Sequence, residues 1–458
     1  MSGPPDPAGP VPLREVVRLA GPALPVLAAE PLYLLVDTAV VGRLGAVPLA
    51  GLAVAGVLFA QVTGQLNFLS YGTTARAARL HGAGRRSAAV GEGVQATWLA
   101  LAVGLLVLGV GQLVAGPVTT ALGDGGAVAA AAESWLRVAL CGAPLVLVTL
   151  AGNGWMRGVQ DTARPLRYVL AGNVLSALLC APLVHGLGAF SGLGIVGSAL
   201  ANVTGQVVGA GLFLSALRHE RALSLRGEAP ADAPVALRPQ WALLRAQLGM
   251  GRDLLARSLA FQACFLSAAA VAARFGAAAV AAHQIVLQLW FFMALVLDAI
   301  AIAAQSLVGS ALGAGDVPRA RGLARQVARY GLVLGTGFGV VFAALAGVLP
   351  RVFTTDPAVL AVVPAAWWFF AGMQPVTGVV FALDGVLLGA GDAAFLRTWT
   401  LVGAAAGFLP LTWLSLAFGW GLTGIWIGLT LFMILRLVSL LWRWRSGHWA
   451  VVGAVRTN

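Results

Sequence analysis

Long apolar runs separated by short polar segments follow one another along the whole 458-residue chain. Each run is long enough to cross a bilayer as an α-helix, since about 20 mainly apolar residues span the roughly 30 Å of hydrocarbon. The pattern therefore predicts a polytopic membrane protein built of twelve transmembrane helices. These spans lie near residues 16–41, 47–73, 93–115, 127–151, 166–186, 195–217, 248–273, 278–311, 327–349, 359–389, 396–418 and 422–442.

One long polar segment divides the spans into two sets of six. Between Arg218 and Pro239 lie four arginines, three acids and three prolines, a composition typical of a linker. The expected regions are an N-terminal tail (1–15), an N-lobe (16–217), a linker (218–247), a C-lobe (248–442) and a C-terminal tail (443–458).

The two halves repeat one another at a constant offset of 231 residues, without gaps. Because equivalent residues fall on the same side of the predicted membrane, the repeat is parallel rather than inverted. We therefore expect an all-α fold of two six-helix lobes related by this repeat. The matching pairs include Arg43/Arg274, Gly45/Gly276, Gly84/Gly315, Pro144/Pro375, Gly154/Gly385, Gly158/Gly389 and Asp161/Asp392.

Arginines gather in alternate loops, which predicts the orientation of the spans. The loops near Arg85, Arg164, Arg245, Arg321 and Arg397 all fall on one side of the membrane, whereas the other side carries few arginines. By the positive-inside rule the arginine-rich side is cytoplasmic, and an even number of spans then places both termini in the cytoplasm.

Composition excludes several classes of function. Only 10% of residues are charged, and the net charge of +12 is spread over loops rather than gathered on one face, which argues against nucleic-acid binding. The chain has no lysine, so it has no Walker A loop and no Schiff-base lysine. The five histidines form no HExxH motif. We expect no enzyme activity, no cofactor and no dedicated metal site.

Ionisable residues inside a span are costly and usually functional. Asp37, near the end of the first span, is the leading candidate, with Glu30 about two helical turns earlier and Tyr33 between them. Carboxylates facing one cavity of low dielectric can exchange a proton for a cation, which is the chemistry of an antiporter. The alternative role for Asp37 is an interfacial carboxylate paired with Arg43.

Other polar residues within the spans could complete a site. In the first half the candidates are neutral side chains that could line the Asp37 cavity. In the second half an Arg257 ion pair with Asp298 or Asp384 could equally be structural. The candidates are Asn173, Ser176, Cys180 and Asn202 in the first half, and Arg257, His283, Gln284, Gln288, Asp298 and Asp384 in the second.

Four segments also carry a family resemblance: EPLYLLVDTAVVGRLG (30–45), AARFGAAAVAAHQIVLQ (272–288), DAIAIAAQSLVGSALGAGD (298–316) and QPVTGVVFALDGVLLGAGD (374–392). They resemble the multidrug and toxic compound extrusion (MATE) family, in its DinF-type branch, over nearly the whole chain. The resemblance implies an antiporter that exports cationic or amphiphilic compounds through the cell membrane, driven by protons or sodium.

The family's first-span aspartate corresponds to Asp37. The branch's fifth-span amide and acid correspond to Ser176 and Cys180, and its sixth-span threonine corresponds to Asn202. Because the fifth-span acid is absent, we favour protons, and sodium at Asp37 stays open. We expect the protein to work as a monomer in the lipid bilayer.

Two rival functions remain at this point. A flippase for lipid-linked precursors of the same superfamily would need several cationic residues in its cavity, and only Arg257 argues strongly for that. A membrane-embedded transferase would need an acidic or histidine cluster at the membrane surface, and the sequence has none.

Overall fold

The computed structural model describes residues 13–123, 125–188, 190–225 and 235–454. Within these residues the chain is helical, and its one bridge between extended residues joins Leu187 to Phe190. The helices form two compact units: Gly21–Gly251 is the first, and Met1–Ala20 with Arg252–Asn458 is the second.

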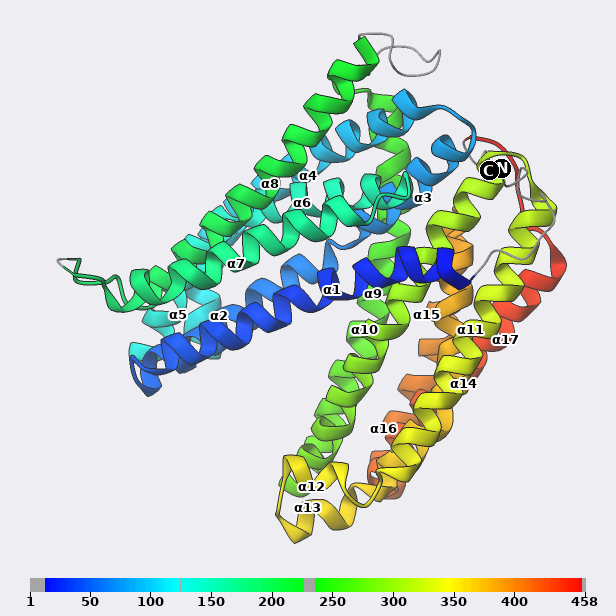
Figure 1. Cartoon of the computed structure of the whole chain (residues 1–458). Helices are drawn as coiled ribbons and strands as arrows, with labels where there is room; N and C mark the ends of the chain where they lie inside the picture. The colour runs from blue at the N-terminus through cyan, green and yellow to red at the C-terminus, as the bar shows by residue number, and fades with distance from the viewer. Residues whose placement is uncertain (1–12, 124, 189, 226–234, 455–458) are drawn as a thin grey trace. The chain divides into compact units, whose positions relative to one another are not determined.

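The first unit holds most of α1, all of α2 to α8, and the start of α9 (Figure 1). Helices α7 and α8 run side by side in opposite directions (Figure 1), and small residues let their backbones approach closely where Gly172 meets Gly205. The helices are α1 (Leu13–Gly42), α2 (Ala46–Gln65), α3 (Phe68–Gly82), α4 (Arg86–Leu122), α5 (Gly126–Cys141), α6 (Ala143–Gly158), α7 (Ala163–His185), α8 (Ile195–Leu225) and α9 (Trp241–Arg274).

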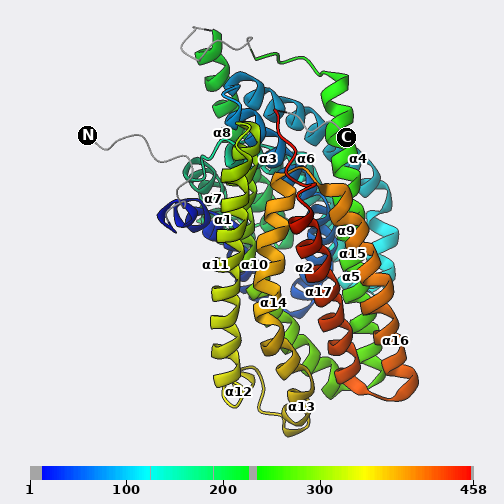
Figure 2. The same ribbon diagram turned by 90° about the vertical axis from the view of Figure 1, so that its right-hand side faces the viewer.

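The second unit packs α14 against α10, α11 and α17 (Figure 2). One span contains the π-helical turn η1, which ends two residues before Pro410. Proline has no backbone N–H to donate to the helical hydrogen-bond ladder. The remaining elements are α10 (Ala277–Gly313), α11 (Val317–Ala344), α12 (Leu349–Phe353), α13 (Pro357–Val362), α14 (Pro364–Gly389), α15 (Ala393–Gly403), η1 (Ala404–Phe408), α16 (Leu409–Phe418) and α17 (Gly421–Ser446).

The prediction of twelve spans is confirmed. Eleven helical segments of the described chain are long and apolar enough to cross a membrane, and the bent pair α5–α6 makes the twelfth. That pair bends by 47° at Gly142, and Pro144 is the second residue of the helix that follows. The largest error in the predicted boundaries is in the ninth span, expected at 327–349, because α11 begins ten residues earlier on a polar, arginine-bearing turn.

The 231-residue repeat is visible in the backbone of each unit. Gly84 and Gly315 turn the chain with φ of 73° and 80°, and Gln160 and Gly391 do so with φ of 63° and 72°. Gly154 lies against the carbonyl oxygen of Ser70, and Gly385 lies against that of Ala301, again 231 residues on. Equivalent positions therefore make the same turns and the same close helix contacts.

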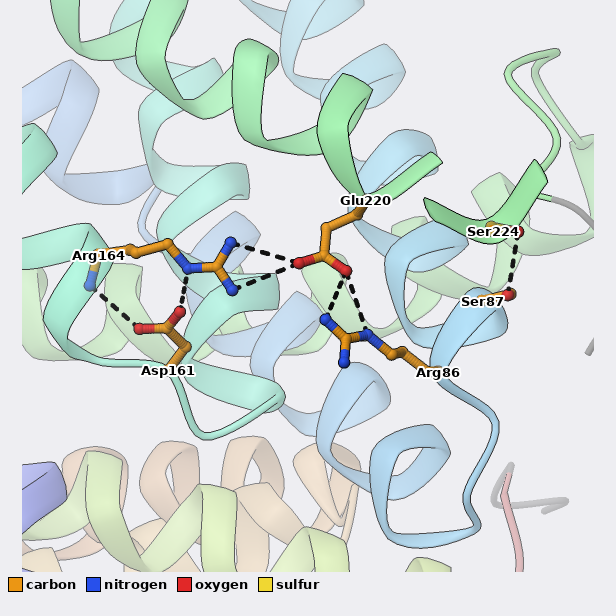
Figure 3. Close-up of polar contacts among 6 residues, drawn as sticks. All are labelled: Arg86, Ser87, Asp161, Arg164, Glu220 and Ser224. Carbon is orange, nitrogen blue, oxygen red and sulfur yellow. Dashed lines mark hydrogen bonds and ion pairs between the residues drawn. The ribbon is translucent and has the colours of Figure 1, made fainter. Parts of the chain in front are cut away.

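Ion pairs join the arginine-bearing loops at one end of the first unit (Figure 3). Glu220 near the end of α8 binds Arg86 at the start of α4 (2.7 Å) and Arg164 at the start of α7 (3.3 Å). Arg164 also pairs with Asp161 in the α6–α7 loop. These three loops thus lie on one face, as the alternation of spans requires.

The second unit gathers its equivalent loops in the same way. Arg443 at the end of α17 pairs with Asp392 before α15 at 2.7 Å, and the backbone N–H of Gly453 donates to the carbonyl oxygen of Leu312 at the end of α10. Each unit therefore keeps its arginine-rich loops together. Which face is cytoplasmic remains a prediction from loop charge.

The segment predicted as a linker is largely built into helices. Helix α8 continues to Leu225 and α9 begins at Trp241, so 218–225 and 241–247 are helical. The chain before α9 packs on the first unit, where Gln95 and Trp98 of α4 bind the carbonyl oxygens of Arg238 and Leu237. Residues 226–234, with Glu228 and Asp232 of the predicted linker, lie outside the described residues, as do 1–12 and 455–458 of the predicted tails.

Candidate functional site

Asp37 is an acid fully enclosed inside the first unit. Its side chain is 0% exposed, although it lies on a helix long enough to span a membrane. The thiol of Cys180 on α7 donates to its Oδ1 at 3.3 Å. Arg43, the alternative partner, is exposed, so the structure places Asp37 in the interior of the unit rather than in a surface ion pair.

One further polar side chain, Ser198, lies beside this carboxyl group. The Ser198 hydroxyl on α8 lies within interaction range of Asp37 and also accepts a hydrogen bond from Nε1 of buried Trp135 at 3.0 Å. Oδ2 of Asp37 has no hydrogen bond of normal geometry to any described residue. A buried carboxylate with an open oxygen can take up a proton or a small cation, which is the chemical requirement of a coupling site.

The sequence prediction named Asn202 as the α8 member of this site, and the structure places it elsewhere. Asn202 lies one helical turn beyond Ser198, beside Tyr33, and lines a separate cavity. Ser176 is buried and packs against Gly205, where α7 and α8 meet. The polar residue of α8 beside Asp37 is therefore Ser198, which sequence reasoning missed.

A cavity of about 360 Å³ opens in the first unit among α1, α2, α3, α6, α7 and α8. Four of the predicted residues line this cavity: Glu30, Tyr33, Asn173 and Asn202. Asp37 does not line it. A cavity of this size accommodates one small organic molecule. Sequence reasoning missed nine other polar lining residues: Thr63, Asn67, Ser70, Tyr71, Thr149, Asn153, Arg157, Tyr168 and Gln206.

Helix α1 therefore connects two different environments. Glu30 and Tyr33 face the cavity, and Asp37, on the same helix, is bound by α7. The helix carries Pro22, Pro25 and Pro31, each of which leaves a carbonyl without its N–H donor, so α1 can bend at low cost. A change at Asp37 can thus reach the cavity through a single helix.

The second unit buries a cluster of three charged side chains. Oδ2 of Asp384 on α14 accepts hydrogen bonds from Arg257 on α9 (2.5 Å) and from Arg436 on α17. Both guanidinium groups also lie over the ring of Phe261, at 5.7 Å and 5.1 Å from its centroid. The structure thus pairs Arg257 with Asp384, one of its two expected partners, and adds Arg436, an arginine inside a span that sequence reasoning missed.

Three other candidates of the second half have different surroundings. Gln284 and Gln288 of α10 are exposed, and His283 is buried with its ring against Trp426 at 5.9 Å between centroids. Asp298 is half-buried and has a partner of its own. No group of three or more metal-binding side chains occurs within the described residues.

The amino-acid sequence matches a known protein family in both halves. The family model MatE matches residues 22–181 and 254–414, one stretch in each half. The chain belongs to the MATE family.

The relatives of this MATE protein match it over almost its whole length. It is 35% identical to Protein DETOXIFICATION 44, chloroplastic, of Arabidopsis thaliana, covering 96% of this chain and 84% of that protein. It is 32% identical to the DNA damage-inducible protein F of Escherichia coli, covering 93% and 92%. A crystal structure of MATE in the bent conformation has the same fold, with a TM-score of 0.84 and 21% identity over 96% of each chain.

Family membership confirms several of the predictions above. The chain is a multi-pass membrane transporter of a multidrug efflux family and not an enzyme. Its helices match the two-lobed fold of MATE transporters.

Proposed function

We propose that this MATE protein is a secondary active antiporter that exports cationic or amphiphilic small molecules in exchange for protons. The observation that carries the proposal is Asp37: an acid with no exposed surface, on a membrane-spanning helix, with one oxygen free of hydrogen bonds. An unpaired buried charge is expensive in a membrane, so a buried acid that binds and releases a cation is a natural coupling group.

Cargo and coupling ion occupy different places in this proposal. The cargo binds in the cavity, where Glu30 supplies the negative charge, and the proton binds at Asp37. Protonation of Asp37 weakens the hydrogen bond that its carboxylate accepts from Cys180. Because Glu30 and Tyr33 lie on the same helix as Asp37, the resulting movement of α1 also shifts these two residues. The proton and the cargo therefore bind at two different carboxylates, and movement of α1 makes binding at one site weaken binding at the other.

Protons are favoured over sodium by the donors near Asp37. Sodium and other hard cations prefer several oxygen ligands, and the thiol of Cys180 is a poor substitute for one. The rival role as a lipid-precursor flippase is disfavoured because the guanidinium of Arg257 is engaged with Asp384 rather than free for a phosphate.

The test is transport in proteoliposomes with imposed pH or sodium gradients, using a fluorescent cationic dye. The wild-type protein should move dye under a pH gradient, and Asp37→Asn should lose nearly all gradient-driven transport while still binding dye. Glu30→Gln should retain part of the transport and weaken dye binding. Normal transport by Asp37→Asn would refute the coupling assignment, and dye movement only under a sodium gradient would refute proton coupling.

A further inference from the structure

The cavity of the first unit collects buried polar atoms that have no hydrogen-bond partner. Folded proteins leave few such atoms, and each one calls for a physical explanation, among them a functional role or a bound ion or water. Three of the side chains concerned are at least nine-tenths buried: Tyr33, Ser70 and Asn153. The atoms without a partner among the described residues are the hydroxyl oxygens of Tyr33, Ser70 and Thr149 and the Oδ1 atoms of Asn153 and Asn202.

All the unsatisfied groups of this cavity can accept a hydrogen bond: the three hydroxyl groups can accept or donate, and the two amide oxygens only accept. The Oδ1 atoms of Asn153 and Asn202 can only accept a hydrogen bond, and so can the carboxylate of Glu30. Asn173 already donates its Nδ2 to the carbonyl oxygen of Val169 at 3.1 Å, which leaves its own oxygen for a ligand. Arg157, the cation of the cavity, has a partner of its own. The two amide oxygens and the Glu30 carboxylate therefore need hydrogen-bond donors from whatever the cavity binds.

These acceptors come from three helices, so one ligand can meet them together. Thr149 and Asn153 lie one turn apart on α6, Asn202 is on α8 and Glu30 is on α1. An ammonium group that carries hydrogens suits this cavity, because its positive charge can pair with the Glu30 carboxylate and its N–H groups can donate to the neutral acceptors. A quaternary ammonium or phosphonium ion has the charge but no N–H donor, so it would leave the acceptors unsatisfied.

Building on the proposed function, we propose that the cavity selects protonated amines with two or more N–H donors over quaternary cations of similar size. Sites built to bind a polar hydrogen discriminate strongly against an analogue that lacks it, because their own polar groups are then buried without partners. Selectivity here would arise from Asn153, Asn202 and Thr149, while Glu30 attracts both kinds of cation.

The experiment compares dansylcadaverine, a primary amine, with its N,N,N-trimethyl derivative, which has the same charge and apolar body. Binding to the purified full-length protein in nanodiscs is followed by dansyl fluorescence, so the readout does not depend on transport. We expect the primary amine to bind at least about tenfold more tightly. The double variant Thr149→Val with Asn153→Leu should reduce the preference below about threefold, chiefly by weakening binding of the primary amine.

A matched control replaces a threonine outside the cavity. Thr430→Val in α17 removes a hydroxyl that bonds only its own helix, at the carbonyl oxygen of Trp426 (2.8 Å), and should keep the full preference. Equal binding of the two wild-type ligands would overturn this inference and leave the proposed antiport intact. A clear preference in binding without gradient-driven transport would uphold the inference and refute the antiport. If neither compound binds, this inference is refuted, and the antiport is decided by the proteoliposome assay.

Discussion

At the scale of single residues, the two units surround a buried acid with different partners. Asp37 in the first unit accepts a hydrogen bond from a neutral thiol at Oδ1, and its Oδ2 has no partner among the described residues. Asp384 in the second unit accepts hydrogen bonds from two arginines at Oδ2, and its Oδ1 likewise has no partner among the described residues. The first arrangement suits coupling, and the second suits a permanent connection among α9, α14 and α17.

The three-residue cluster should be sensitive to which member is removed. Asp384→Asn leaves two buried guanidinium groups without an acid and should destabilise the protein by about 3 kcal/mol or more. Arg257→Met leaves a neutral Asp384–Arg436 pair and should cost clearly less. Thermal unfolding of the purified variants in one detergent measures this order. A smaller loss for Asp384→Asn than for Arg257→Met would contradict a stabilising role for the carboxylate.

At the scale of helices, contacts between helix backbones depend on glycine at particular positions. Gly385 of α14 lies directly against the carbonyl oxygen of Ala301, whereas Gly372 on the same helix faces open space. Alanine normally stabilises a helix interior relative to glycine by about 1 kcal/mol. The close contact at Gly385 should outweigh this gain, because a methyl group there must push α14 away from α10.

The paired substitutions Gly385→Ala and Gly372→Ala test that packing. We expect Gly385→Ala to lower the unfolding temperature, with a cost of about 1–3 kcal/mol, and Gly372→Ala to leave it unchanged or slightly raised. The measurement is thermal unfolding of both variants beside the wild type. Equal unfolding temperatures for the two variants would show that α10 and α14 do not pack this closely.

The ion pairs of Figure 3 should hold the end of α8 in place. Glu220 is buried and binds both Arg86 and Arg164, so Glu220→Gln removes the charge from both contacts. Hydrogen exchange in residues 215–225 should become faster as a result. The control is Glu133→Gln, which breaks a solvent-exposed pair with Arg137 and should change little. Unchanged exchange near Glu220 would argue against this anchoring role.

Helix positions were predictable because their signals are local. An apolar run of about 20 residues and a turn glycine are visible without the fold, so the spans and the 231-residue repeat were found correctly. The cavity was predictable only in part, because Asn153 and Gln206 come from helices that only tertiary packing brings together. The register of α8 against α7, set where Gly172 meets Gly205, puts Ser198 rather than Asn202 beside Asp37. Arg436, an arginine inside an apolar span, could have been found from sequence alone.

At the scale of the whole molecule, the predicted orientation depends on loop charge and can be tested at the two ends of one helix. Helix α10 carries exposed residues just inside its start, at Ala277, and just after its end, at Ala314. Ser446, at the end of α17, should lie on the same side as Ala314, since the chain that follows it bonds to the end of α10. Asp356, before α13, should lie with Ala277. The predicted topology places Ala314 and Ser446 in the cytoplasm.

Single cysteines at these four positions, in a background without Cys141, Cys180 and Cys264, report their side of the membrane. A membrane-impermeant maleimide should label Ala277→Cys and Asp356→Cys in intact cells, and should reach Ala314→Cys and Ser446→Cys only after the membrane is opened. The physical reason is the excess of arginine in the loops beside Ala314 and Ser446, which resists transfer across the membrane. If the labelling pattern were completely reversed, the predicted spans would stand but the protein would have the opposite orientation in the membrane. External labelling at both ends of α10 would mean that this helix does not cross the membrane, which the twelve-span fold does not allow.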